Sequence, residues 1–195
     1  MSVFADAGTF LIQSLASIYL VVLMLRFLLQ LSQADFYNPV SQFAHKATAF
    51  ALVPLRKICP AWGRVEFSCV VLALLLQWLA IQLTASINGY PLINVFYVLL
   101  WGLLGIASLV INFYTYGLLA AIILSWVAPQ NKHPVVALLW QLMEPVMAPF
   151  RKLVPSLGGL DLSPIIIFIL LNLLRIFVIN AANATSLPAW AVPGI

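Results

Sequence analysis

The stretch VPLRKICPAWG, residues 53–63, occurs a second time as APFRKLVPSLG, residues 148–158. A constant shift of 95 residues, from Pro54 to Pro149, superimposes the two copies without a gap. The shift also aligns Arg56 with Arg151, Lys57 with Lys152, Pro60 with Pro155 and Gly63 with Gly158. Each copy interrupts long apolar sequence with two prolines and an Arg-Lys pair. The sequence therefore predicts two tandem repeats, residues 1–95 and 96–190, followed by a tail, 191–195.

The composition around these stretches predicts an integral membrane protein. Hydrophobic residues make up 64% of the chain and charged residues only 7%, whereas soluble proteins carry about 25% charge. No Asp, Glu, Lys or Arg occurs from Phe67 to Asn131. A bilayer core takes about 20 apolar residues per helix, so this run alone holds two spans. Asp6, and no basic residue, precedes the first apolar run, so we expect that run to be a retained span rather than a cleaved signal peptide.

The apolar runs predict an all-α fold with four transmembrane helices, at about 9–31, 67–87, 104–127 and 164–185. Apolar sequence already resumes at Leu92, so residues 92–103 form a lead-in to the third span. We favour a helical extension over a short re-entrant piece that ends near Gly102 and Gly105. At the fourth span, Ser163 is a possible helix cap, and Pro164 fits the first turn.

Between the spans of each repeat the sequence predicts a shorter helix that lies in the bilayer interface on the cytoplasmic face. Apolar residues recur at helical spacing over 40–52, opposite a polar face that includes His45 and Lys46. The counterpart is 135–144. Prolines are expected to bound these helices, because proline starts a helix readily but does not continue one. These loop positions are Pro39, Pro54, Pro60, Pro134, Pro149 and Pro155, with Pro54 expected to end the first helix and Pro145 to cut the second short.

The basic residues predict the orientation of the chain. Seven of the nine Lys and Arg residues lie in the two loops that hold the repeated stretch, and the turn at 86–91 has none. The positive-inside rule places both loops in the cytoplasm and both termini outside. Each repeat has two spans, so the repeats share one orientation, and their symmetry axis is expected to run along the membrane normal.

Several spaced motifs carry a family resemblance. They are DFYNP at 35–39, PLRK at 54–57, EP at 144–145, PFRK at 149–152 and GGLDLSP at 158–164. With these motifs the chain resembles the two-repeat form of the YggT family of bacterial inner-membrane proteins. The resemblance implies a loose association with osmotic-stress tolerance and, in distant relatives, with division or photosynthetic-membrane organisation. It implies no catalytic residues. One departure is that Cys69 stands in the first repeat where Pro164 stands in the second.

The duplicated basic pairs are the main binding candidates. Arg56, Lys57, Arg151 and Lys152 are expected to engage anionic lipid head groups or an acidic partner, since each basic residue is worth about 1 kcal/mol near an anionic surface. Against this stands a role as topology anchors only.

Two carboxylates occupy equivalent positions at the cytoplasmic start of the second and fourth spans, Glu66 and Asp161. We expect a structural role for both, because a carboxylate there favours the positive end of the helix dipole and lies near the basic pairs.

Charged residues inside the spans are also candidates, because polar groups in a membrane are costly. Arg26 lies near the end of the first span and is expected to snorkel to the cytoplasmic surface. Arg175 lies twelve residues into the fourth span, about 18 Å from its start. It either pairs with an amide, such as Gln77, Gln82, Asn112, Asn172 or Asn180, or lies near the outer interface of a tilted span.

These features favour a non-enzymatic membrane organiser or accessory protein. The bilayer, with anionic phospholipids, is the expected partner, together with a protein partner or a second copy; a net charge of +4 placed in loops does not indicate nucleic acid. No metal-ligand spacing, nucleophile motif or cofactor loop occurs, so neither a metal nor a cofactor is predicted. The alternative is a small oligomeric channel or transporter component for an ion or polar solute. An enzyme acting on lipid lacks a recognisable catalytic set.

Overall fold

The computed structural model describes residues 3–128, 133–153, 161–188 and 192, and those residues form six helices. In chain order the helices are α1 (Val3–Leu31), α2 (Pro39–Arg56), α3 (Phe67–Ile87), α4 (Val95–Val127), α5 (Pro134–Leu153) and α6 (Ser163–Ala184). The described part has no β-sheet, only an isolated bridge between Trp62 and Val65. Four helices, α1, α3, α4 and α6, are long and apolar enough to cross a bilayer. The predicted all-α membrane fold with four spans is confirmed.

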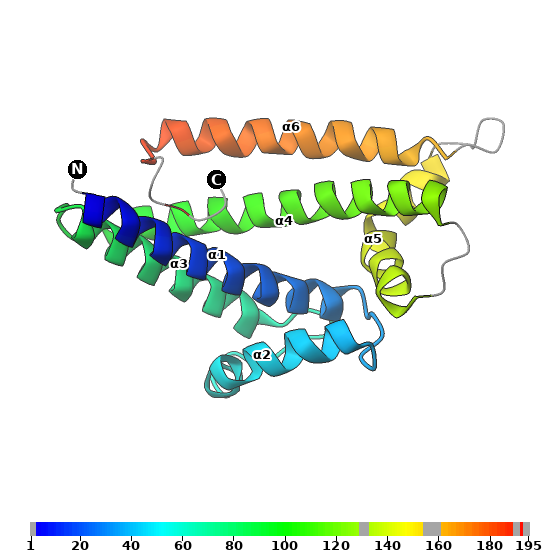
Figure 1. Cartoon of the computed structure of the whole chain (residues 1–195), viewed down its shortest axis with the longest axis horizontal. Helices are drawn as coiled ribbons and strands as arrows, with labels where there is room; N and C mark the ends of the chain where they lie inside the picture. Colours follow the sequence, from blue (N-terminus) through cyan, green and yellow to red (C-terminus); the bar gives the residue numbers. More distant parts are fainter. Residues whose placement is uncertain (1–2, 129–132, 154–160, 189–191, 193–195) are drawn as a thin grey trace.

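The helices pair within each repeat (Figure 1). α1 packs along α3, and α4 packs along α6. α2 contacts both helices of the first pair, and α5 contacts both helices of the second. α2 and α5 therefore hold the same place in the two halves, at the end of the bundle opposite the N-terminus. The repeats meet mainly where α3 packs on α4.

α4 is the longest helix, with 33 residues, so it extends about 50 Å at 1.5 Å per residue. It runs without a break through Gly102 and Gly105, and the Asn94 side chain caps its start by accepting a hydrogen bond from the Phe96 amide at 2.9 Å. The lead-in is thus a helical extension, as favoured from the sequence, and it is not a re-entrant piece.

The two shorter helices between the spans are longer than predicted, because the prolines do not end them. α2 continues through Pro54 to Arg56. Proline removes the hydrogen bond to the carbonyl four residues earlier and crowds that carbonyl. Pro54 lies in the last turn of α2, so few later hydrogen bonds depend on it. α5 continues through Pro145 and Pro149 to Leu153. These two prolines are four residues apart, on one exposed face of the helix, where the freed carbonyls are not enclosed by protein.

The start of α6 also differs from the prediction. Ser163 lies inside the first turn and its side chain makes no cap hydrogen bond. The Asp161 carboxylate takes the cap role instead, because its Oδ1 accepts a hydrogen bond from the Ser163 amide at 2.9 Å. Pro164 lies in the first turn as expected.

Polar side chains fasten the end of the bundle that holds the N-terminus. The Asn88 amide donates to Thr9 Oγ1 at 2.9 Å and so joins the end of α3 to α1. Gln82 of α3 exchanges two hydrogen bonds with the backbone of Ile93, just before α4. The Trp101 indole donates to Thr185 Oγ1 at 3.1 Å, between α4 and the end of α6. The opposite end of the bundle, with α2 and α5, carries most of the Lys and Arg residues and is the basic end of the molecule.

Candidate functional site: two charged clusters at the basic end

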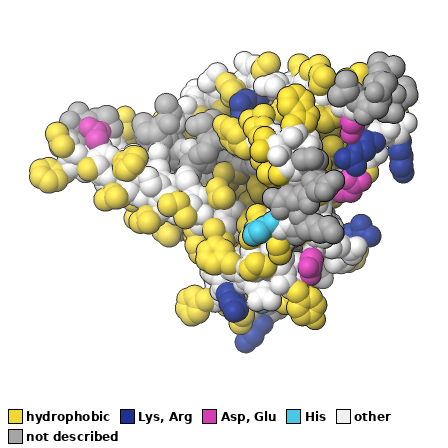
Figure 2. Space-filling model, turned by 45° about the vertical axis from the view of Figure 1, so that its right-hand side comes forward, with side chains coloured by type: hydrophobic (Ala, Val, Ile, Leu, Met, Phe, Trp, Pro, Cys, Tyr) yellow, Lys and Arg dark blue, Asp and Glu magenta, His cyan; other side chains and the backbone are white. Residues whose placement is uncertain are grey.

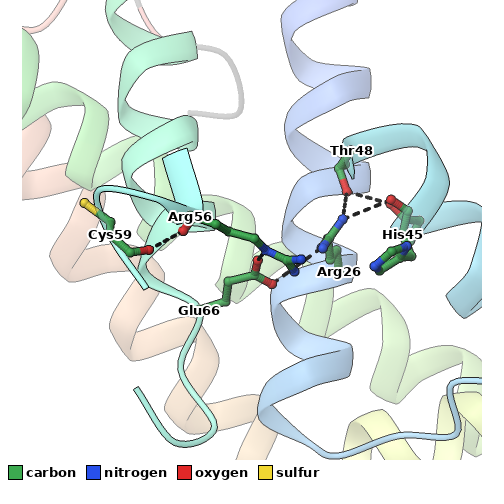
Figure 3. Close-up of polar contacts among 8 residues, drawn as sticks. Arg26, His45, Thr48, Arg56, Cys59 and Glu66 are labelled. Carbon is green, nitrogen blue, oxygen red and sulfur yellow. Dashed lines mark hydrogen bonds and ion pairs between the residues drawn. The ribbon is translucent and has the colours of Figure 1, made fainter. Parts of the chain in front are cut away.

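The first cluster is built from three segments of repeat one that are distant in sequence. Arg26 comes from α1, Arg56 from the last turn of α2, and Glu66 immediately precedes α3. Arg56 Nε donates to Glu66 Oε1 at 2.6 Å, and Arg26 Nε lies 3.5 Å from Glu66 Oε2 (Figure 3). The Glu66 side chain is 0% exposed, whereas that of Arg56 is 42% exposed. A buried carboxylate thus ties the three helices of the repeat together.

Arg26 does not reach the surface, so the predicted snorkelling is wrong. The residue is only 4% exposed. Its Nη1 donates to the His45 carbonyl oxygen at 2.9 Å and to Thr48 Oγ1 at 2.7 Å, both on α2. α2 packs across the end of α1 and offers these acceptors within the protein, so Nη1 of the guanidinium is paired without extending to water. Arg26 therefore links α1, α2 and Glu66.

The electrostatics of this cluster favour an ionised Glu66. Burial alone raises the pKa of the Glu66 carboxyl, but the hydrogen bond from Arg56 and the charges of Arg26 and Arg56 outweigh burial, so the pKa lies below its ordinary value. His45 experiences the opposite field. Its burial and the charges of the same two arginines lower its pKa. The ring of His45 also packs edge-on against Phe36, with centroids 5.4 Å apart. His45 is therefore held neutral beside two cations.

The second cluster has the same backbone plan but different side chains. Arg151, at the end of α5, donates from Nε to Asp161 Oδ2 at 3.1 Å and from Nη1 to Glu144 Oε2 at 2.8 Å. All three side chains are between 38% and 53% exposed. Burial raises the pKa of Asp161, but hydrogen bonds from Ser163 and Arg151 outweigh it and the pKa falls below its ordinary value. The second cluster is thus an open version of the first.

The two clusters carry opposite excess charge. Repeat one holds two arginines against one carboxylate, and repeat two holds one arginine against two. A shift of 95 residues places Ala121 at the position of Arg26, and Ala49 at the position of Glu144. In Figure 2 the charged side chains gather mainly along the right and lower margins of the visible face, and hydrophobic side chains cover much of the rest.

The duplicated basic pairs divide into two kinds of residue. The predicted lipid- or partner-binding residues Arg56 and Arg151 are engaged by carboxylates of their own repeat. The adjacent residues Lys57 and Lys152 are exposed, and neither side chain has an ion pair with any described residue. Sequence reasoning treated each pair as one unit, because exposed and internally paired cations look alike in a sequence.

Glu66 and Asp161 lie where the sequence placed them, at the starts of α3 and α6, and both pair with the arginine of their own repeat. Of the loop prolines, Pro39 and Pro134 are the first residues of α2 and α5. Pro54 and Pro149 lie inside those helices, Pro60 lies in the loop before α3, and Pro155 lies outside the described residues.

Two contacts between the repeats were not predicted. Asn38 accepts from the Val40 amide at 3.0 Å, which caps α2, and it donates to the Pro134 carbonyl oxygen at 2.7 Å. Gln141 Oε1 of α5 accepts from the Asp35 amide at 2.8 Å. The Asn-Pro dipeptide at 38–39 signals a helix start, but the sequence carries no signal for a partner about 100 residues away.

Within the spans, Arg175 pairs with an amide, as one of the two interpretations held. Arg175 Nη2 of α6 donates to Asn112 Oδ1 of α4. Asn172 does not join this pair; its amide donates to the Phe168 carbonyl oxygen of its own helix at 2.9 Å. Among the described residues no group of His, Cys, Asp and Glu side chains could hold a metal ion.

Comparison with models of known protein families identifies the family of this chain. The model of the CCB3/YggT family matches residues 5–87 and again residues 100–182. The chain belongs to the CCB3/YggT family. Both bounds of the second match lie 95 residues after those of the first, which is the shift seen in the repeated stretch.

Relatives in other organisms support membership. The chain is similar to an uncharacterized protein of Pseudomonas aeruginosa, 43% identical over 93% of each chain. It is also similar to the uncharacterized protein YggT of Escherichia coli, 36% identical over 91% of this CCB3/YggT chain and 92% of that one. A chloroplastic YlmG homolog of Arabidopsis thaliana is 40% identical over 32% of this chain and 24% of its own length. No solved structure matches the chain.

Proposed function

We propose that this CCB3/YggT protein is a non-enzymatic organiser or accessory protein of the bacterial inner membrane. Its exposed lysines at the basic end engage anionic lipid head groups or an acidic partner. The observation that carries the proposal is the division within each basic pair. Each arginine is paired with a carboxylate of its own repeat, so it holds the helices together. Lys57 and Lys152 remain exposed at equivalent positions and are available to an external anion.

The exposed side chains of α2 support a location in the bilayer interface. Ser41 and Thr48 face the protein and are buried, whereas Phe43 and Phe50 are exposed, with Lys46 beside them. A helix that turns its polar side chains inward and aromatic ones outward fits contact with acyl chains better than contact with water. With the basic residues in the cytoplasm, both termini lie outside.

A labelling experiment tests the orientation. Cys59 is half-buried in the loop after α2, and Cys69 is buried in α3, so one thiol dominates the reaction. A thiol reagent that cannot cross membranes should leave Cys59 unlabelled in intact spheroplasts and label it after permeabilisation. A Cys59→Ser variant supplies the background. Labelling in intact spheroplasts would reverse the topology.

A lipid-enrichment experiment tests the lysines. Protein reconstituted with mixed neutral and anionic phospholipids should gather anionic lipid, measured by energy transfer from its tryptophans to a pyrene-labelled phosphatidylglycerol. Lys57→Gln with Lys152→Gln should weaken this association by about five-fold per lysine, the equivalent of about 1 kcal/mol each. The charge-preserving pair Lys57→Arg with Lys152→Arg is the control. Equal enrichment in all three proteins would argue against lipid and leave an acidic protein partner, which affinity purification in mild detergent would reveal.

A biological role linked to osmotic-stress tolerance or to envelope and division processes belongs to the same proposal. A deletion strain should show slower growth or altered division after an osmotic shift, restored by the wild-type gene and only partly by the double lysine-to-glutamine variant. Normal growth and division of the deletion strain through the shift would remove this part of the proposal.

The Arg175–Asn112 pair supports a second candidate, a small oligomeric channel or transporter component. A guanidinium held between two spans is a feature of polar pathways through membranes. Against it, the only Asp or Glu within the spanning helices is Asp6, in the first turns of α1. Purified protein in liposomes should show no ion or solute flux if the organiser proposal is right. A flux that Arg175→Ala alters would favour the channel.

A further inference from the structure

A cavity of about 170 Å³ opens beside the repeat-one cluster, between the end of α1 and α2. Since one water molecule occupies about 30 Å³, the cavity has room for several waters or for one tetrahedral oxyanion. Its wall contains Arg26, Arg56 and His45, with Ser41, Gln30 and Ala34 around them. The donors share the wall with apolar side chains, which include Leu29 and Phe36.

The charge on this wall is not balanced within the protein. Arg26 and Arg56 share the single carboxylate Glu66, and Arg26 is 4% exposed. Arg26 Nη2 is buried and has no hydrogen-bond partner, and neither does the buried Glu66 Oε2, which lies 3.5 Å from Arg26 Nε. A buried guanidinium that lacks a partner on one nitrogen, in a cluster with one excess positive charge, is costly unless an anion compensates it. Burial, together with the charges of Arg26 and Arg56, lowers the pKa of His45 on the same wall.

We propose that this cavity binds a phosphate group, which belongs either to an anionic phospholipid or to a free phosphate compound. Guanidinium groups suit this ligand, because their planar forks match phosphate oxygens. Arg56 contributes the exposed guanidinium, and the buried Arg26 adds its positive charge to the same wall. The site is distinct from Lys57 and Lys152 and does not depend on them.

The residues that carry the charge on this wall are not repeated in the second half of the chain. The 95-residue shift replaces Arg26 by Ala121, Ser41 by Val136 and His45 by Trp140. One cavity per chain therefore binds phosphate, although the lysines occur in both repeats. Binding should saturate at one phosphate group per chain.

The two histidines provide the measurement. The full-length protein is held in an uncharged maltoside detergent at constant ionic strength in chloride. The pH is varied, and NMR follows the ring protons of His45 and His133. A phosphate near His45 supplies the opposite charge, so the pKa of His45 should rise while the His133 titration stays unchanged. Arg26, Arg56 and Glu66 are the charged groups that face His45, and their own charges do not change near neutral pH.

Two ligands distinguish the sources. If short-chain phosphatidylglycerol shifts the His45 titration and inorganic phosphate does not, the ligand is a lipid head group. If inorganic phosphate also shifts it, the site takes free phosphate. If neither ligand shifts the His45 titration, the proposal is overturned.

Variants separate the cavity from general electrostatics. Ala34→Phe fills the cavity and keeps every charge, and Arg56→Gln removes the exposed guanidinium; each should weaken phosphate binding at least ten-fold. Arg151→Gln, the matched change in repeat two, should leave binding unchanged. Lys57→Gln with Lys152→Gln should also leave it unchanged even where lipid enrichment is lost, so this site and the proposed function can fail separately. Unaltered binding in a folded Ala34→Phe protein would place the phosphate elsewhere.

Discussion

At the scale of single residues, Glu66 and Asp161 show how equal sequence positions acquire unequal roles. Both precede a span and both pair with the arginine ten residues earlier. Their positions and structural role were predictable from the repeat and the helix dipole. The burial of Glu66 was not, because it depends on Arg26, which lies 40 residues away on another helix.

We predict that Glu66→Gln lowers the free energy of unfolding by about 3 kcal/mol, because it leaves the buried Arg26 without its counter-charge. Asp161→Asn should cost less than about 1 kcal/mol, since its ion pair is exposed. Denaturant unfolding of both variants in the same detergent, followed by tryptophan fluorescence, gives the comparison. Similar losses in the two variants would contradict the assignment of Glu66 as the buried centre.

The lowered pKa of His45 predicts a pH dependence of stability. The folded protein binds this proton less readily than the unfolded chain, so stability is complete above the ordinary pKa of 6.5 and falls as pH decreases below it. The carboxyls of Glu66 and Asp161, whose pKa values are also lowered, contribute only at more acidic pH.

His45→Gln should therefore remove most of the change in unfolding free energy between pH 7.5 and 5, measured in phosphate-free detergent. Wild-type protein at the same two pH values supplies the comparison. A pH dependence in His45→Gln equal to that of wild type would show that another group is responsible.

At the scale of elements, α2 and α5 follow the sequence rules for where helices begin but not those for where they end. Prolines at the first positions of α2 and α5 were predictable. Pro54, Pro145 and Pro149 were expected to end these helices, but α2 and α5 continue through them. Packing of α2 on α1 and α3, and of α5 on α4 and α6, outweighs the loss of single hydrogen bonds. That packing is not visible in a single segment of sequence.

The cap of α2 provides a test at this scale. Asn38→Ala removes both the cap bond and the bond to the Pro134 carbonyl of the other repeat. Asn94→Ala removes only the equivalent cap of α4. A cap is worth about 1 kcal/mol and an added hydrogen bond about 1 kcal/mol more. Asn38→Ala should therefore destabilise the protein by about twice as much as Asn94→Ala in thermal or denaturant unfolding, and equal costs would argue against the contact between repeats.

At the scale of the whole molecule, the 95-residue shift predicts four spans in two repeats, and the structure has this plan. The interface between the repeats could not be predicted from the sequence. Its main part is the contact of α3 with α4, where Gln77 of α3 is fully buried against the helix of the next repeat. Gly105 makes room for that amide, since a Cβ there would lie 2.6 Å from Gln77 Nε2.

Gly105→Ala should thus displace the buried side chains of Gln77 and Val192, each 2.6 Å from the new Cβ, and cost about 1–3 kcal/mol, the range for overpacking. Gly102→Ala, one turn earlier, places its Cβ 3.4 Å from Gln77 and Leu74, close to ordinary contact, and should have a much smaller effect. Unfolding in detergent measures both. If Gly105→Ala does not lower the free energy of unfolding, the two repeats pack less closely than in the structure.

The unequal lengths of the paired helices have a consequence for the surrounding lipid. α4 carries exposed aromatic rings near both ends, Tyr97 and Trp126, about 43 Å apart along the axis. That is the thickness of a bilayer with its head-group layers. Its neighbour α6 has 22 residues and spans about 33 Å. Lipids on the two sides of one helix pair therefore meet different hydrophobic lengths. Such a mismatch costs fractions of a kcal/mol per Å, enough to sort the protein laterally into bilayer regions of matching thickness.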